Sequence, residues 1–492
     1  MSNAPDLVAE AARPIADGVR KSPMDILGGL LGQIDLPIDA GGGTVSIEGD
    51  DPIVDSRFRP GAAAAAALAA QGLGVAAIWK ARTGISQDVS VEARRAAVPG
   101  LRTINFMRQN GHAHDLFPRS TKSFTDFFPT KDGKQLYLLR TTLYVENLIG
   151  TLELLGCNYD AQSMARAVAK WDALELEEAL AERRLIGVVA RPHEEWLAHP
   201  QGRWLAARPP VEIEKIGDSA PEPLLPAARP LAGVRVLDFT HILAGPVTAR
   251  MLAEQGADTL HVSAQHQMDP MRLGIDTGAG KRSTHLDIDH PGDLATLRRL
   301  AEDADIFVQS WRPGSIDKRG LSPEALAERR PGIIYVSVSA YGAGGPWADR
   351  AGYEPVGQAA CGLVLEEGSA DKPRLAVTGT LNDYLAAYLG AAGTMAALLR
   401  RSREGGSYHV KVSLTRTSMW MQEIGRLPHV EWPERDIPME ARPSDLMTMQ
   451  SPFGMITIPG PITQYSRTPG YFDRPPEPFG ASLPGWLPEP RG

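Results

Sequence analysis

Cysteine is scarce in this chain of 492 residues, which contains only Cys157 and Cys361. Two cysteines cannot form a disulfide framework, so the composition predicts a reducing compartment. Residues 1–21 carry charges throughout and lack the apolar core of a signal peptide. The longest apolar run, residues 61–79, is rich in alanine and contains Gln71, so we interpret it as a buried helix rather than a membrane span. Together these features predict a cytoplasmic protein without a membrane partner.

An excess of positive charge is also missing. The chain has 51 Lys and Arg against 59 Asp and Glu, a formal net charge of −8. The absence of a basic stripe that could neutralise phosphates argues against a general nucleic-acid binder. Hydrophobic residues make up 43% and charged residues 22%, as in soluble globular proteins, and a chain of 492 residues predicts two or three domains.

The common nucleotide, hydrolase and metal motifs are absent as well. The strand-to-helix turn HILAGPVTAR (241–250) has neither a G-x-G-x-x-G nor a P-loop pattern, so neither NAD nor an NTP is expected. No G-x-S-x-G elbow occurs, and neither cysteine has a histidine nearby in sequence. His112 and His114 have no third ligand beside them, so no metal is expected. This elimination leaves a carboxylate as the candidate nucleophile.

One carboxylate, Asp383, stands near the start of the apolar stretch LNDYLAAYLGAAGTMAALLRR (381–401). Asp is among the best helix N-caps, so a plain capping role is one interpretation. The partial positive charge of a helix N-terminus also keeps a nearby carboxylate ionised, and an ionised carboxylate in a dry site can act as a nucleophile. The stretch alone does not decide between these two roles.

The same stretch belongs to an internal repeat. A shift of 321 positions brings residues 65–91 onto residues 386–412 without a gap, and both copies predict a small-residue helix, a glycine stop and an alternating strand. In the first copy, Ala62 stands where the second has Asp383. If this carboxylate performs chemistry, only the second copy retains it.

Proline-rich segments and turn residues indicate how the chain is divided into domains. A Pro-rich linker precedes a region in which strands and helices alternate, and this alternation predicts an α/β fold with a doubly wound, Rossmann-like parallel sheet. A hairpin with Asp132-Gly133 as its turn opens a smaller α+β domain before the linker. The predicted segments are 1–120 with the degenerate repeat copy, 121–218 as small domain, 219–233 as linker, 234–420 as large domain and 421–492 as an extended, Pro-rich C-terminal arm.

Several motifs in this order resemble one known family. They are VRVLDFTHILAGPVTARMLAEQGAD (234–258), GKRSTHLDI (280–288), ADIFVQSWRPGSIDKRGLSPEAL (304–326), AGYEPVGQAACG (351–362) and the Asp383 helix. Together they look like the family III CoA-transferases, also called the CaiB/BaiF family, which includes enzymes similar to formyl-CoA transferase and carnitine CoA-transferase. The motif EEWLAHPQGRWL (194–205) resembles part of the small domain of that family.

The resemblance implies a function and a set of site residues. Asp383 would attack an acyl-CoA thioester, with Glu354 assisting, and coenzyme A would pass from the acyl-CoA to a free carboxylic acid through a mixed anhydride and an enzyme thioester. The family expectation also includes an interlocked homodimer. The resemblance assigns the binding of coenzyme A to Leu243, Ala244, Lys281, Arg282, Leu286, Ser310, Trp311, Arg312, Lys318 and Tyr353.

Two alternatives stay open from the sequence. Racemases of the same family place a histidine where Tyr353 stands, and an acyl-CoA racemase or isomerase would use Asp383 as a base. A CoA-binding member without turnover is the second alternative, because Ala264 stands where relatives carry a basic residue that meets a CoA phosphate.

Overall fold

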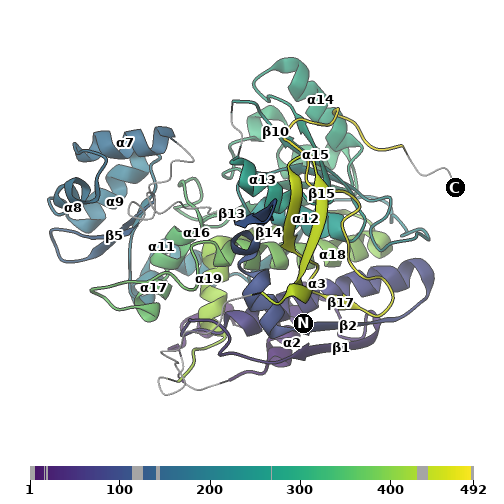
Figure 1. The fold of residues 1–492 in the computed structure, drawn as a ribbon, viewed down its shortest axis with the longest axis horizontal. Helices are drawn as coiled ribbons and strands as arrows, with labels where there is room; N and C mark the ends of the chain where they lie inside the picture. Colours follow the sequence, from purple (N-terminus) through teal and green to yellow (C-terminus); the bar gives the residue numbers. More distant parts are fainter. Residues whose placement is uncertain are drawn as a thin grey trace.

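The computed structural model describes residues 6–15, 17, 20–113, 126–139, 145–266, 269–428 and 441–488. Its centre is a seven-stranded sheet in the order β11-β10-β9-β12-β13-β14-β8 (Figure 1). Neighbours from β11 to β14 run parallel, and β8 pairs antiparallel at one edge. The strands are β8 (Val211–Gly217), β9 (Arg235–Phe239), β10 (Asp258–Ser263), β11 (Lys281–His285), β12 (Ile306–Gln309), β13 (Ile334–Ser339) and β14 (Ser407–Ser413).

Helices connect these strands in the alternation that the sequence predicts, which confirms the doubly wound α/β fold. Because β9 leads to β10 on one side and β12 lies on its other side, the strand order reverses between β9 and β12. Such a switch point opens a crevice at the carboxyl ends of the strands. The helices of this region are α12 (Ala244–Glu254), α13 (Met271–Thr277), α14 (Pro291–Glu302), η2 (Asp317–Arg319), α15 (Pro323–Arg329), α16 (Glu354–Ala360), α17 (Leu363–Glu367), α18 (Leu381–Glu404) and α19 (Leu414–Glu423).

A smaller α+β unit lies to the left of the large sheet in Figure 1. Its hairpin turns at Gly133, whose φ of 78° favours glycine, and this confirms the turn predicted at Asp132-Gly133. Two short helices, α10 (His193–Ala198) and α11 (Pro200–Ala206), lead from this unit to the large sheet. The unit consists of β5 (Asp126–Pro129), β6 (Gln135–Leu138), β7 (Gly187–Val189), α7 (Val145–Leu155), α8 (Ala161–Val168) and α9 (Ala173–Glu182).

The alanine-rich run near the N-terminus forms one long helix, α3 (Pro60–Thr83). By length and composition it could cross a membrane, but its most apolar window is 100% buried inside the protein, as the sequence predicts for a core helix. It packs against α18 and α2. The other elements of this region are α1 (Leu7–Ala11), α2 (Pro23–Ile34), β1 (Gly42–Glu48), β2 (Gln87–Glu92), α4 (Ala93–Arg95), η1 (Ala96–Gly100) and α5 (Thr103–Phe106).

The internal repeat has matching geometry in its two copies. Each helix ends at a glycine with a positive φ, 74° at Gly84 and 70° at Gly405, and such values favour glycine. Each helix also has a glycine that packs tightly on the strand that follows it: a Cβ atom at Gly72 would lie 2.7 Å from Val89, and one at Gly393 would lie 2.8 Å from Val410.

The strands around the two copies match as well. The three-stranded sheet β1-β2-β17 pairs β2 with a parallel and an antiparallel neighbour, as β14 is paired in the order β13-β14-β8. The strand β17 (Gln464–Tyr465) takes the place that β8 has in the large sheet. These shared features support descent of both copies from one supersecondary unit.

The C-terminal region differs from the extended arm expected from its prolines. Leu446–Ser451 and Gly454–Pro459 form the hairpin β15-β16, because alternating β-branched and methionine side chains precede the Pro-rich part. The hairpin continues into β3 (Arg108–Gln109) and β4 (His112–Ala113), which makes a four-stranded sheet. Beyond β17 the described chain follows the surface without further helices or strands.

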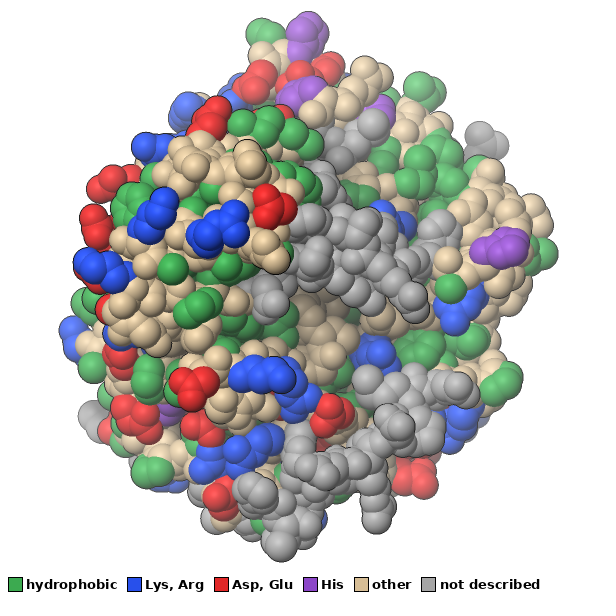
Figure 2. Space-filling model, turned by 60° about the vertical axis from the view of Figure 1, so that its left-hand side comes forward, with side chains coloured by type: hydrophobic (Ala, Val, Ile, Leu, Met, Phe, Trp, Pro, Cys, Tyr) green, Lys and Arg blue, Asp and Glu red, His purple; other side chains and the backbone are tan. Residues whose placement is uncertain are grey.

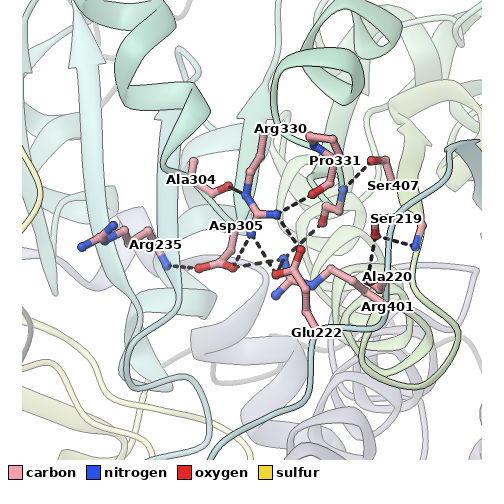
Figure 3. Close-up of polar contacts among 12 residues, drawn as sticks. Ser219, Ala220, Glu222, Arg235, Ala304, Asp305, Arg330, Pro331, Arg401 and Ser407 are labelled. Atoms are coloured by element: carbon pink, nitrogen blue, oxygen red, sulfur yellow. Dashed lines mark hydrogen bonds and ion pairs between the residues drawn. The ribbon is translucent and has the colours of Figure 1, made fainter.

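The Pro-rich linker is fixed to the large sheet by an ion-pair network (Figure 3). Glu222 of the linker pairs with Arg330, with an Nη2–Oε2 distance of 2.9 Å, and Arg401 pairs with Asp305 at 3.0 Å. Ser219 accepts a hydrogen bond from the Gly406 backbone N–H at 2.8 Å. Elsewhere on the surface, basic and acidic side chains are interspersed over the described residues of the face in Figure 2.

Candidate active site

A cavity of about 290 Å³, here called cavity 1, opens at the switch point between β9 and β12. The loop after β9 and the loop after β12 form one side, and the start of α18 contributes Asp383. Residues predicted for the site thus come together from distant parts of the sequence. Those that line cavity 1 are Leu243, Ala244, Ser310, Trp311, Arg312, Tyr353 and Asp383.

Asp383 is the third residue of α18, and the N-cap is Thr380. The simple capping interpretation is therefore wrong, because the helix begins earlier than the sequence pattern indicates. The Asp383 side chain accepts a hydrogen bond from the backbone N–H of Ala244, the first residue of α12. The carboxylate thus lies at the N-termini of two helices, where aligned peptide dipoles favour negative charge.

Close approach at this point depends on a glycine and on a constrained loop. A Cβ atom at Gly245 would lie 2.7 Å from the Thr240 side chain, so the first turn of α12 tolerates no larger residue there. Ile242, in the loop before it, has a φ of 67°, an unfavourable conformation for a β-branched residue. Asp269 accepts a hydrogen bond from the Ile242 N–H at 2.6 Å and fixes this conformation. Strained backbone of this kind is concentrated at functional sites.

The environment of Asp383 favours its protonated form. Burial raises the pKa of Asp383 well above its ordinary value, the negative charge of Glu354 raises it further, and the hydrogen bond from Ala244 opposes both. Its side chain is only 8% exposed. A carboxylate that is ionised here is poorly solvated, and poor solvation increases its reactivity toward a carbonyl carbon.

Glu354, the first residue of α16, lies behind Asp383 and does not line cavity 1. Its Oε1 atom accepts hydrogen bonds from Asn382 N at 3.0 Å, Asn382 Nδ2 at 2.8 Å and Gln358 Nε2 at 2.6 Å. Burial raises the pKa of Glu354 to about 7, against these hydrogen bonds. Glu354 therefore caps the start of α18 and influences Asp383 through its charge.

The first copy of the repeat has a corresponding carboxylate. Asp51 accepts hydrogen bonds from Gly61 N at 3.2 Å and Ala62 N at 2.8 Å, and these positions correspond to Asn382 and Asp383. A carboxylate from outside the helix thus caps both small-residue helices. The first copy thus has this cap although Ala62 stands where the second copy has Asp383.

A second cavity of about 230 Å³, cavity 2, adjoins cavity 1. Both cavities are lined by His241, Trp311, Arg312 and Ser315, which therefore form their border. Cavity 2 has apolar walls that include Leu286, as predicted for the CoA site, and Ala264. The Trp311 ring packs against the His241 ring with centroids 4.8 Å apart.

Three predicted cations do not line either cavity. Lys281 is buried, and its Nζ atom donates to Asp238 Oδ2 at 2.7 Å and to the Pro246 carbonyl at 2.6 Å. Arg282 pairs with Asp258 at 2.9 Å on the other side of β11. Lys318 is exposed on η2 outside the lining of both cavities. This geometry does not favour a phosphate-binding role for these three residues.

Other polar residues line the cavities without having been singled out in the sequence. His241 lies at the border, and burial lowers its pKa. Arg319, directly after Lys318, lines cavity 2 and pairs with Asp289. Arg184 and Arg350 line cavity 1. Of these residues, only Arg319 could have been found from the sequence, because it directly follows the predicted cation Lys318.

Metal ligands do not gather in the described part of the chain. Within it, no group of three or more His, Cys, Asp or Glu side chains is placed to hold a metal ion. His114 lies outside the described residues, so the interpretation of His112 and His114 as residues without a third ligand is not tested.

Comparison with known proteins gives a family match for part of the chain. Residues 231–453 match the model of CoA-transferase family III. This part of the chain is therefore a domain of CoA-transferase family III. The match covers the seven-stranded sheet from β9 onward together with both loops that border the cavities.

Curated proteins that are similar to this chain include CoA-transferases. An acetyl-coenzyme A transferase of Hypoxylon pulicicidum is 30% identical over 65% of this chain and 59% of its own length. A succinyl-CoA–D-citramalate CoA-transferase of Chloroflexus aurantiacus is 33% identical over 38% of this chain and 49% of its own length. The chain thus spans about half the length of the curated relatives that it matches. Among solved structures, Rv3272 of Mycobacterium tuberculosis is 30% identical, with a TM-score of 0.37 over 40% of this chain and 58% of that chain.

Proposed function

We propose that this family III protein moves coenzyme A from an acyl-CoA to a free carboxylic acid, with Asp383 as the nucleophile. The observation that carries the proposal is the position of Asp383. Its carboxylate lines a cavity at the switch point of the sheet, at the N-termini of α12 and α18. A buried carboxylate is the nucleophile that the reaction requires.

The reaction balances without a metal or redox cofactor. The Asp383 carboxylate attacks the thioester carbon, the C–S bond breaks, and the CoA thiolate leaves a mixed anhydride. The thiolate then attacks the Asp383 carbonyl, which releases the donor acid and forms an enzyme thioester. The acceptor carboxylate attacks this thioester to give a second anhydride, and the thiolate takes the acceptor acyl group and restores Asp383. No proton is consumed in this sequence, which suits a site where His241 is kept neutral.

The N-terminus of α12 supplies the electrostatic support for these steps. Its first N–H, from Ala244, already bonds to Asp383, and Gly245 lines the cavity beside it. Backbone N–H groups at a helix start stabilise the oxyanion that forms when a thioester or anhydride carbonyl is attacked. Each well-placed donor of this kind contributes about 3 kcal/mol to transition-state stabilisation.

The two adjoining cavities suit a long, bent ligand such as acyl-CoA. In this proposal the adenine lies in cavity 2 against Leu286 and Trp311, and the pantetheine chain crosses the border toward Asp383. Arg312 lies at that border and lines both cavities, so it is the cation best placed for the diphosphate. A cytoplasmic location and an interlocked homodimer are further parts of the proposal that come from the family resemblance and the composition.

Trapping the covalent intermediates tests the proposal. The protein is incubated with an acyl-CoA and treated with hydroxylamine or borohydride, and the peptide that contains Asp383 is analysed by mass spectrometry. A hydroxamate or a reduced side chain at Asp383, absent in Asp383→Asn, is the expected result. Transfer of CoA between acids with an unmodified Asp383 would refute the proposed mechanism.

The same preparation separates the alternative reactions. A racemase or isomerase exchanges the α-proton of an acyl-CoA for deuterium without exchange of CoA between acids. Binding of CoA without either reaction would identify a non-catalytic member. Tyr353, which is half-buried in the wall of cavity 1, supports CoA transfer rather than racemisation, because the racemases of this family have a histidine at the corresponding position.

A further inference from the structure

Part of the wall of cavity 1 comes from the small α+β unit. Asn147 of α7 and Arg184 and Ile186 of the turn between α9 and β7 line cavity 1, and none of them lines cavity 2. They are therefore not among the residues of the border between the two cavities, which a pantetheine chain would cross. Within the proposed function, this end of cavity 1 is the space left for the acyl group and the acceptor acid.

Arg184 occupies a backbone position that normally belongs to glycine. Helix α9 ends in a Schellman motif: the Arg184 N–H donates to the Ala181 carbonyl at 2.9 Å, and the Leu185 N–H donates to the Leu180 carbonyl at 2.9 Å. This motif places residue 184 in the left-handed region, with a φ of 59°. Glycine adopts that conformation freely, whereas arginine does not. The chain keeps an arginine at this position, and its side chain lines the cavity.

The charge of Arg184 is also uncompensated within the described part of the protein. No carboxylate there lies within 4.0 Å of its guanidinium group as an ion-pair partner. By contrast, Arg350 is bound by both carboxylate oxygens of Glu178, at 2.6 and 2.7 Å, and lies over the Trp347 ring. Arg312 lies at the border with cavity 2. Arg184 is thus the cation of this wall that is available for an anionic ligand.

A second polar group lies in the same wall. The Oδ1 atom of Asn147 is buried and has no hydrogen-bond partner among the described residues. A 180° turn of the side-chain amide exchanges its oxygen and nitrogen, so the same group presents either an acceptor or a donor. A buried amide without a partner is costly unless a ligand or water satisfies it.

Apolar residues also contribute to the wall of cavity 1. Ile186, Val338 and Leu414 line cavity 1 together with Ala340 and Ala351. The cavity therefore offers the carboxyl group of Asp383, which is only 8% exposed, apolar lining residues, an exposed cation at Arg184 and a partly buried amide at Asn147. The complementary ligand has a reactive carboxyl at one end, a hydrocarbon spacer and an anionic group at the other end.

From this juxtaposition we infer that cavity 1 selects dicarboxylic acids and their CoA monothioesters, with Arg184 and Asn147 binding the distal carboxylate. The inference rests on the proposed function and adds its substrate class. Arg184 acts as a specificity-determining residue, because it contacts the part of the substrate that does not react. The arginine fork suits a carboxylate, since it donates two parallel hydrogen bonds.

Paired acceptor acids test the inference. Each dicarboxylate from malonate to adipate is compared with the monocarboxylate of equal carbon number, for example succinate with butyrate, using one acyl-CoA donor. We expect kcat/KM to favour the dicarboxylate of best-fitting length about tenfold or more, the range of a charge-assisted hydrogen bond. Arg184→Gly should bring this ratio close to one, whereas Arg184→Lys should retain part of it.

A matched control separates charge from position. Arg183 is the preceding residue, is exposed and does not line cavity 1, so Arg183→Gly removes the same charge one residue earlier and should leave the ratio unchanged. Arg184→Gly should be no less stable than the wild type, because glycine suits the left-handed position. A loss of the ratio without a loss of stability is a result that a structural role for Arg184 does not produce.

Binding measurements keep the inference independent of turnover. Calorimetric titration of Asp383→Asn with the same acids, in the presence of CoA, should give a preference for the dicarboxylate that Arg184→Gly abolishes. If no covalent adduct forms but this preference persists, the proposed reaction fails and the inferred site stands. Equal binding of both acids would overturn the inference. So would an Arg184→Gly variant in which the KM for the acyl-CoA donor rises equally with every acceptor, because the arginine would then bind a CoA phosphate.

Discussion

Gly74 and Met395 occupy the same position in the two copies of the repeat, 321 residues apart, and they lie against each other where α3 crosses α18. A Cβ atom at Gly74 would lie 2.4 Å from the Met395 Cβ. When a residue contacts its own counterpart, the two elements are related by a local two-fold axis, as in a symmetric dimer. The repeat therefore forms an interface of this type within one chain.

Substitution of Gly74 tests this contact. Gly74→Ala should lower the free energy of unfolding by about 1–3 kcal/mol, because the new methyl group overlaps Met395 and α3 has no free space to move into. Urea denaturation measures the change. Gly28→Ala in α2 is the matched control: its new methyl group meets no atom within 4 Å, so helix propensity should stabilise that variant by about 0.5–1 kcal/mol. Equal effects of the two substitutions would contradict the overlap.

Asp383→Asn should separate activity from stability. The amide cannot attack a thioester, so kcat/KM for CoA transfer should fall about a thousandfold or more. The same change removes a buried carboxylate whose pKa is raised by burial, so the melting temperature should rise by a few degrees. Steady-state kinetics and calorimetry on one preparation measure both effects. Loss of activity together with loss of stability would indicate a structural role for Asp383.

The pH profile should report the influence of Glu354 on Asp383. Asp383 must be ionised to attack, so kcat should fall as the pH decreases through its raised pKa. Glu354→Gln removes the neighbouring negative charge and should move this acidic limb to lower pH.

Glu254→Gln is the control for that shift. Burial raises the pKa of Glu254 to about 7 as well, but Glu254 lies at the end of α12 and faces a different cavity. This control should leave the acidic limb where it is in the wild type. An acidic limb that does not respond to Glu354→Gln would show that the two carboxyl groups are not coupled.

Asp51 should make stability depend on pH. Burial raises the pKa of Asp51 to about 6 from 3.8, so between these values the folded state holds a proton that the unfolded state releases. Its contribution to stability is complete below about pH 4 and is lost as the pH rises through about 6, up to about 3 kcal/mol. Asp51→Asn should flatten this part of the profile in urea denaturation from pH 4 to pH 7. Parallel curves for the variant and the wild type would contradict the raised pKa.

The sequence predicted the parts of the fold that depend on local patterns. The alternation of buried strands and amphipathic helices after residue 234 was sufficient to predict the parallel sheet. The pair Asp132-Gly133 was sufficient to predict the hairpin turn. The family resemblance assigned Leu243, Trp311 and Asp383 to one site, because each follows a strand end or begins a helix in a recognisable motif. All three residues line cavity 1.

Other parts of the site depend on contacts between distant segments. Lys281 was predicted to face a phosphate, but its position on β11 directs its Nζ atom to the buried Asp238. Arg184 could not be found from a motif, because it reaches the cavity through the way the small unit lies beside the large sheet. The capping role of Asp51 likewise depends on a loop that returns to the start of α3.

The pairing of α3 with α18 has a consequence for the number of reactive centres that the proposed mechanism predicts. In a homodimer, a substitution in the sequence occurs in both subunits, so either both subunits keep the nucleophile or both lose it. Here the two copies are different segments of one chain, and the first has Ala62 where the second has Asp383, although α3 still packs against α18. In the proposed mechanism, an excess of the reagent that traps the covalent intermediate should therefore modify one aspartate, Asp383, in each polypeptide.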